Sequence, residues 1–135
     1  MTVILDLYGV LLKEHAPTLQ AFVKETKSAE MAQVVDSYYE KAAHGLMDGT
    51  ALMRECGYIF PESAAEYYAT ERVTLDTDFF RFAKRCEKEG VSLWLAGNGV
   101  KDMVDHLCRH RGLDKIFAGT AVSSELKAWT PEDAF

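Results

Sequence analysis

Apolar runs, separated by polar and turn-forming residues, divide the chain into strands and helices. Residues Thr2–Leu5 are largely apolar and β-branched, which predicts a short buried strand that ends at Asp6. Residues 91–96 and 119–122 have a similar character and predict two further strands. Residues 101–111 repeat apolar positions at helical spacing, so a helix is expected between the second and third strands.

Residues 13–72 show helical spacing throughout. Leu19, Phe22 and Val23 would share one helical face there. No strand pattern of comparable strength interrupts this block. It predicts a helical insert between the first strand and the rest of the sheet.

Another helix is expected just before the second strand. Asp78 is placed as its N-cap, and the spacing puts Phe79 and Phe82 on its inner face. Trp94 lies within the second strand, so we expect its side chain in the core. Residues 123–135 are predicted to be mainly loop.

Strands separated by helices of these lengths pair in parallel through right-handed crossovers. The expected fold class is therefore α/β, with a Rossmann-like parallel sheet and an inserted helical cap. Residues 1–12 and 73–135 would form the α/β core, and residues 13–72 the cap.

Composition narrows the class of protein. The 135 residues carry a formal net charge of −6, which argues against non-specific binding to nucleic acids or anionic membranes. No apolar run is long enough for a transmembrane helix, and the N-terminus lacks the basic region of a signal peptide. Cys56, Cys86 and Cys108 lack metal-binding spacing, so we expect reduced, buried thiols in a cytoplasmic protein.

Asp6 has the clearest chemical potential. A carboxylate at the carboxyl end of a strand, before a turn that contains Gly9, can face a ligand. It can then act as a covalent nucleophile or hold a metal ion. The same position also suits a carboxylate that only caps the turn. Position in the sequence leaves both roles open.

The segment VILDLYGVLL resembles the first motif of the haloacid dehalogenase-like (HAD) hydrolases. Asp6 matches the family's nucleophile and Gly9 its turn glycine. Gly97-Asn98-Gly99 resembles the second motif, in which Asn98 fits and Gly97 lacks the usual hydroxyl. The helical block between the motifs resembles the helical cap of one branch of the family. The resemblance therefore covers essentially the whole chain.

The resemblance implies a site at this edge of the sheet. Asp6, Tyr8 and Lys127 would be its catalytic residues, and the turn 97–99 would bind the substrate. Lys127 would balance the negative charge of Asp6 and of a bound anion. The competing interpretation is that Lys127 is a solvated loop residue. Mg²⁺ would be held by the Asp6 carboxylate and the backbone carbonyl of Tyr8.

The most populous activity of the family is Mg²⁺-dependent hydrolysis of phosphomonoesters, which is our first expectation, through an aspartyl intermediate on Asp6. Tyr8 departs from the family's phosphatases, which place an acid–base carboxylate there. A phenol with a pKa of about 10 is poorly matched to proton transfer at pH 7. Haloacid dehalogenases carry Tyr at this place and release halide, which needs no proton. The second hypothesis is therefore a metal-independent 2-haloacid dehalogenase.

A third hypothesis is a truncated or degenerate, non-catalytic HAD-like module. The sequence ends before the acidic strand that follows the Lys motif in the family. Without that strand, the first strand would be an open apolar edge. We expect either a longer natural chain or a cover such as a second copy, which would make a homodimer. The other expected partner is a small anionic substrate, with no nucleic acid and no membrane.

Overall fold

The structure, a computed structural model, describes residues 1–7, 11–12 and 16–127. The strands are β1 (Thr2–Asp6), β2 (Ser92–Gly97) and β3 (Gly119–Val122). The α-helices are α1 (Ala16–Thr26), α2 (Ala29–Ala43), α3 (Gly49–Glu55), α4 (Pro61–Tyr67), α5 (Asp78–Lys88), α6 (Lys101–Arg111) and α7 (Ser123–Leu126). A π-helical turn, η1 (Tyr68–Arg72), follows α4, and a 3₁₀ turn, η2 (Leu113–Lys115), precedes β3.

The three strands form one parallel sheet in the order β1-β2-β3. Ile4 pairs with Trp94, and Trp94 with Gly119, so the middle of each strand lies in one row. Helices α5 and α6 connect successive strands, as the alternation of patterns in the sequence predicts. The expected α/β fold with a parallel sheet is confirmed.

The two faces of the sheet differ in burial. Side chains on one face belong to the apolar core: Val3, Leu5, Leu93, Leu95 and Val122. On the other face Ile4 is 68% exposed and Trp94 40% exposed. The expectations of a fully buried first strand and a core Trp94 are therefore wrong. Two right-handed crossovers that step in the same direction place both helices on the same face, which leaves the other face uncovered by the described residues.

The helix before β2 also differs from the prediction in detail. Asp78 is its first residue, not its N-cap, and the backbone N–H of Asp78 donates to the Asp76 side chain at 3.0 Å. Phe79 is buried and stacks on Phe117, with ring centroids 5.5 Å apart. Phe82 is 40% exposed, so its predicted place on the inner face is wrong. It lies at the rim of the helical face whose centre packs on β2.

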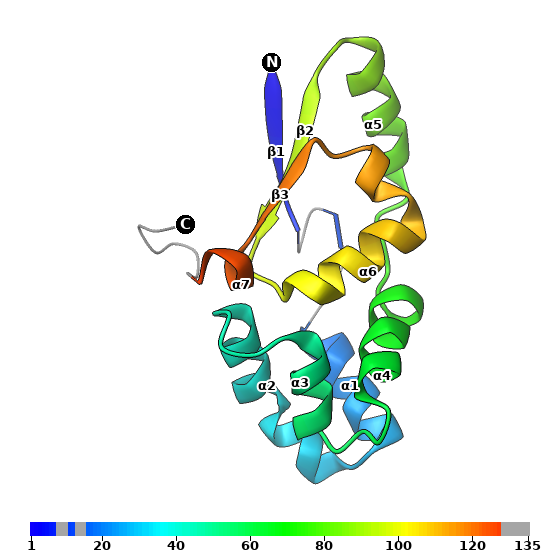
Figure 1. Ribbon diagram of the computed structural model, residues 1–135. Helices are drawn as coiled ribbons and strands as arrows, with labels where there is room; N and C mark the ends of the chain where they lie inside the picture. Colours follow the sequence, from blue (N-terminus) through cyan, green and yellow to red (C-terminus); the bar gives the residue numbers. More distant parts are fainter. Residues whose placement is uncertain (8–10, 13–15, 128–135) are drawn as a thin grey trace.

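The helices of residues 16–72 gather at the end of the molecule opposite the amino ends of the strands. Helix α6 lies between these helices and the sheet (Figure 1). Leu19, Phe22 and Val23 of α1 are buried, as predicted. The chain enters and leaves this helical part at one place, because Leu12 and Leu75 form an antiparallel bridge. The N–H of Asp76 donates to the carbonyl oxygen of Leu11 beside that bridge, at 2.9 Å.

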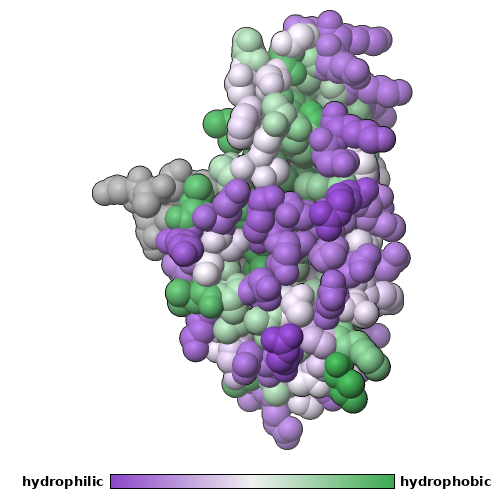
Figure 2. Space-filling view, in the orientation of Figure 1, coloured by the Kyte–Doolittle hydropathy of each residue, from purple (hydrophilic) through white to green (hydrophobic). Residues whose placement is uncertain are grey.

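Hydrophilic side chains gather across the middle of one face of the molecule, where α6 runs (Figure 2). The apolar positions of α6 are buried beneath them: Met103, Val104, Leu107 and Cys108. Residues 101–111 are helical as predicted, and Gly112 ends the helix with a φ of +70°. None of the helices in the described residues is long and apolar enough to cross a membrane.

The three cysteines are free and buried, as expected. Burial raises the pKa of Cys56 and that of Cys108 to about 11. Both thiols therefore stay protonated near neutral pH and pack as small apolar groups.

Candidate active site

The site begins at the carboxyl ends of β1 and β2. Asp6 is the last residue of β1, pairs with Ala96 and is exposed. The backbone N–H of Leu7 donates to the carbonyl oxygen of Ala96 at 2.8 Å. This bond holds the end of β1 against the end of β2, where the chain reaches Gly97.

Gly97 lies directly beside the Asp6 carboxylate. A Cβ at residue 97 would be 2.9 Å from Asp6 Oδ1 and 3.1 Å from the Leu7 Cβ. The backbone at Gly97 also has a φ of +150°, which L side chains rarely adopt. The structure therefore explains the missing hydroxyl in the second motif: this backbone position, against Asp6, does not admit a side chain without a shift.

The rest of the turn, residues 98–99, is held by contacts with Ser123 and Leu7. Asn98 is half-buried. The N–H of Gly99 donates to the Ser123 hydroxyl at 3.0 Å, and a Cβ at Gly99 would lie 3.1 Å from the Leu7 side chain. The turn 97–99 is thus packed between Leu7 and the residue that follows β3.

Tyr8 and Lys127 are the other predicted catalytic residues. Tyr8, like Gly9, lies outside the described residues, so its catalytic and metal-binding roles stay predictions. Lys127 follows α7 with a φ of +54° and is exposed. Its side chain lies against Gly45, at the end of α2, where a Cβ would be 3.0 Å from the Lys127 Cγ. The structure records no ion pair between Lys127 and Asp6, both of which it describes.

Residues 123–126 are a short helix and not the predicted loop. Ser123 is completely buried, and besides accepting from Gly99 its hydroxyl donates to the carbonyl oxygen of Ala43 at 2.5 Å. Ser124 accepts from the backbone N–H of Lys101 at 2.8 Å and so caps the start of α6. Sequence analysis missed both serines. The available signal was a pair of hydroxyl residues at the carboxyl end of a predicted strand.

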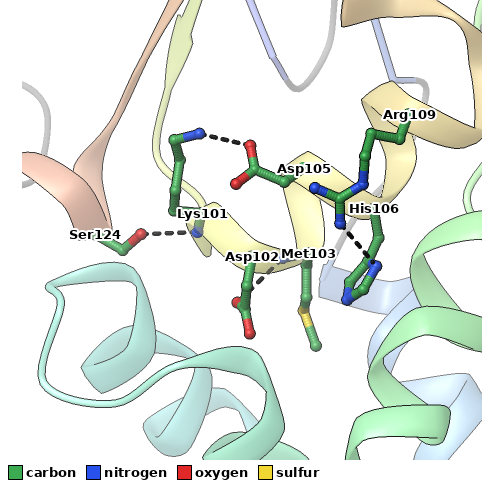
Figure 3. A network of polar contacts seen from close by, with 7 residues as sticks. All are labelled: Lys101, Asp102, Met103, Asp105, His106, Arg109 and Ser124. Atoms are coloured by element: carbon green, nitrogen blue, oxygen red, sulfur yellow. Dashed lines mark hydrogen bonds and ion pairs between the residues drawn. The ribbon is translucent and has the colours of Figure 1, made fainter.

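Polar side chains on α6 continue the site toward the helical part, as Figure 3 shows. Lys101 Nζ contacts Asp105 Oδ1 at 2.5 Å. Asp102 extends toward α3 and accepts from the N–H of Gly49 with both carboxylate oxygens at 2.9 Å. Ser124 lies on the opposite side of Lys101, at its backbone N–H.

A cleft of about 370 Å³ opens between this part of α6 and the helical part. Its lining includes Asp48, Asp105 and Glu125, with Lys101 as its cation. Asp48 is engaged in capping α3, since its side chain accepts from the N–H of Ala51 at 2.7 Å. The lining carries more carboxylates than cations, and the Lys101 ammonium is already paired with Asp105, so the cleft disfavours a small anion.

The described residues fit a magnesium site only in part. Mg²⁺ is commonly bound by one or two carboxylates together with substrate phosphate and water, and Asp6 supplies one exposed carboxylate. Within residues 1–7, 11–12 and 16–127 there is no group of three or more His, Cys, Asp or Glu residues that could hold a metal ion. The described residues thus offer part of a magnesium site.

No family model matches the sequence, and no curated protein matches it. Solved structures do match. The L-2-haloacid dehalogenase from Xanthobacter autotrophicus has a TM-score of 0.64 and 18% identity, over 98% of this chain and 60% of its own. This chain therefore spans about three-fifths of that enzyme's length.

A HAD family enzyme from Bacteroides thetaiotaomicron, solved as a magnesium complex, has a TM-score of 0.72 and 17% identity. The match covers 97% of this chain and 71% of that enzyme. The same enzyme was also solved with magnesium and inorganic phosphate, and the Xanthobacter enzyme with chloropropionic acid covalently bound. At these identities the likeness concerns the fold. The chain has the fold of the haloacid dehalogenase-like hydrolases.

Proposed function

We propose that this protein is a hydrolase in which the Asp6 carboxylate attacks a small anionic substrate, with a phosphomonoester as the first expectation. The observation that supports this most is the exposed carboxylate of Asp6 at the carboxyl edge of the sheet. Beside it, Gly97 packs directly against the carboxylate, since a Cβ there would be 2.9 Å from Asp6 Oδ1. In open α/β sheets this edge is where ligands bind.

In the proposed reaction, a carboxylate oxygen of Asp6 forms a bond to phosphorus as the bond to the alcohol oxygen breaks. The leaving alkoxide takes a proton from water, because a phenol such as Tyr8 is a poor acid at pH 7. Water then attacks the phosphoaspartate, releases phosphate and restores Asp6. Asn98 would orient the bound group, and Lys127 would offset its charge. The magnesium complex of the Bacteroides enzyme supports Mg²⁺ as the cofactor of this reaction, which would offset charge on the phosphoryl oxygens.

The second candidate is a 2-haloacid dehalogenase, which one observation favours specifically. Residue 97 carries no hydroxyl that could donate to a phosphoryl oxygen, and its geometry beside Asp6 does not admit one. In dehalogenation the Asp6 carboxylate would displace halide from carbon and form an ester, which water hydrolyses. Halide leaves without a proton, so dehalogenation needs no general acid at the position of Tyr8.

The test measures phosphate release from small phosphomonoesters with and without Mg²⁺, and halide release from short 2-haloacids, in parallel. Asp6→Asn should lower whichever activity is found by more than about a thousandfold, as removal of a covalent nucleophile does. Asp114→Asn is the matched control, because Asp114 is an exposed carboxylate in η2, before β3. A fully active Asp6→Asn protein would refute the nucleophile. If neither product is released, the non-catalytic module expected as the third alternative is supported.

A further inference from the structure

The hydroxyl of Ser123 joins three parts of the molecule that are distant in sequence. Ser123 directly follows β3 and is 0% exposed. Its oxygen accepts the N–H of Gly99, in the turn beside Asp6, at 3.0 Å. Its proton goes to the carbonyl oxygen of Ala43, the last residue of α2, at 2.5 Å. A single buried hydroxyl therefore connects the candidate site to the helical part.

Two further contacts hold the same segment of the helical part, residues 43–49, against the core. The Asp102 carboxylate of α6 accepts the N–H of Gly49, and Figure 3 shows it pointing toward α3. Gly45 lies so close to α7 that a Cβ there would collide with the carbonyl oxygen of Ser124. Residues 43–49 thus run along the core, and Ser123 is the contact that also touches the site turn.

The Ser123 hydroxyl has one proton to donate. If residues 43–49 move away from the core, that proton loses its acceptor, the carbonyl oxygen of Ala43. Its other acceptor within reach is the carbonyl oxygen of Gly99, now 3.3 Å away. Moving to it would change the polar contacts of the turn 97–99. Because an unpaired buried hydroxyl is costly, the position of residues 43–49 and the geometry of the turn depend on each other.

We propose that Ser123 is a positioning residue that couples the helical part to the turn 97–99, and thereby to Asp6. Docking of residues 43–49 holds the turn in its place beside the carboxylate, and withdrawal of residues 43–49 releases it. The consequence for turnover rests on the proposed function. The coupling itself is a property of the fold and is measured without any substrate.

The first experiment follows amide hydrogen exchange by mass spectrometry in segments 43–49 and 97–99. Ser123→Ala should speed exchange in both segments by at least about tenfold, because one buried hydrogen-bonded group linked them. Ser123→Thr keeps the hydroxyl and should restore slow exchange in both. Ser37→Ala is the matched control, because the Ser37 hydroxyl donates only within its own helix, to Val34.

The second experiment perturbs the coupling from the other side, and its first comparison does not require Ser123→Ala to fold. Gly45 and Gly57 both have a positive φ, +81° and +87°, but a Cβ at Gly57 would meet nothing within 4 Å. Gly45→Ala and Gly57→Ala therefore introduce similar backbone strain and differ in whether residues 43–49 are pushed off the core. Gly45→Ala should speed exchange in segment 97–99, and Gly57→Ala should not. In a Ser123→Ala background, Gly45→Ala should add nothing there.

Exchange that rises in one segment alone, or a Gly45→Ala effect that persists without Ser123, would overturn the coupling. For a substrate whose turnover requires Asp6, Ser123→Ala should lower kcat about tenfold with little change in KM. The reason is that the displaced turn misaligns the reacting groups. Coupled exchange in a protein without Asp6-dependent turnover would refute the proposed function and keep the coupling. Asp6-dependent turnover that is insensitive to Ser123→Ala, together with uncoupled exchange, would refute the coupling and keep the proposed function.

Discussion

At the level of single residues, the environment of Gly97 matters most for the candidate chemistry. Its φ of +150° and the Asp6 oxygen beside it both exclude a side chain. The absent hydroxyl is therefore part of how this site is built, because the close approach of β1 and β2 leaves no room for it. Whatever ligand reaches Asp6 must bind without a hydroxyl from residue 97.

Gly97→Ala should lower the free energy of unfolding by about 1–3 kcal/mol more than Gly90→Ala does. Gly90 also has a positive φ, +69°, but a Cβ there would meet nothing within 4 Å. The difference between the two variants reports the contact with Asp6 together with the greater strain of a side chain at a φ of +150° than at +69°. Urea unfolding followed by circular dichroism measures it. Equal losses in the two variants would show that residue 97 has room for a side chain.

The buried thiols should make the stability of the fold depend on pH. Since burial raises the pKa of Cys56 and Cys108 to about 11 in the fold, against 9.0 for an ordinary thiol, folding favours their neutral form. Their contribution to stability is fully present below about pH 9 and is lost as the pH rises toward 11. Cys108→Ala should therefore show a smaller loss of stability between pH 9 and 11 than the unaltered protein, measured by thermal unfolding. An identical pH dependence would contradict this.

At the level of elements, side-chain hydrogen bonds cap the starts of helices, and the capping residue can be a neighbour in sequence or a residue of another element. Ser28 is the N-cap of α2, and its hydroxyl accepts from the N–H of Met31 at 3.1 Å. Helix α6 begins differently, because its first N–H is capped by Ser124 from α7. A cap that comes from a neighbouring residue can be read from the sequence, whereas a cap that comes from another element cannot.

Ser28→Ala should lower the free energy of unfolding by about 1 kcal/mol, the usual cost of removing an N-cap side chain. Ser37→Ala, in the same helix, removes a hydroxyl that only donates to Val34 and should cost much less. Guanidinium unfolding of the two variants side by side measures the difference. Equal effects would mean that Ser28 does not stabilise the helix end.

For the whole molecule, the main structural consequence of the topology is a sheet face that residues 1–7, 11–12 and 16–127 leave uncovered. Strand β1 is at the edge of the described sheet, and Ile4 and Trp94 lie next to each other on the bare face. The ring of Trp94 also covers Gly119, where a Cβ would collide with it. An apolar face beside an unpaired strand edge favours association with another chain.

We therefore expect concentration-dependent self-association, measured by light scattering, in line with the homodimer proposed from the sequence. Ile4→Lys should weaken it, because a charge on this face must be desolvated on contact. Ile59→Lys is the control, since Ile59 is 84% exposed in the helical part, between α3 and α4. A monomer at every concentration, or equal effects of the two changes, would contradict association through this face.

The sequence by itself determined the order and type of most elements. It placed Asp6 at a strand end, residues 101–111 in a helix and residues 119–122 in a strand, because hydrophobic periodicity and turn residues act locally. The same local signals predicted a parallel sheet, since strands alternate with helices. The helical face of Leu19 was likewise predictable from spacing alone.

Only the tertiary structure decided which sheet face is covered, and therefore that Ile4 and Trp94 are exposed. It also decided that Lys127 lies against Gly45. The contact of Ser123 with Ala43 joins residues 80 positions apart. Such contacts depend on how elements pack, and nothing in the residues near Ser123 specifies its distant partner. The carboxylate of the candidate site was visible in the sequence, and the hydroxyl that positions its surroundings was not.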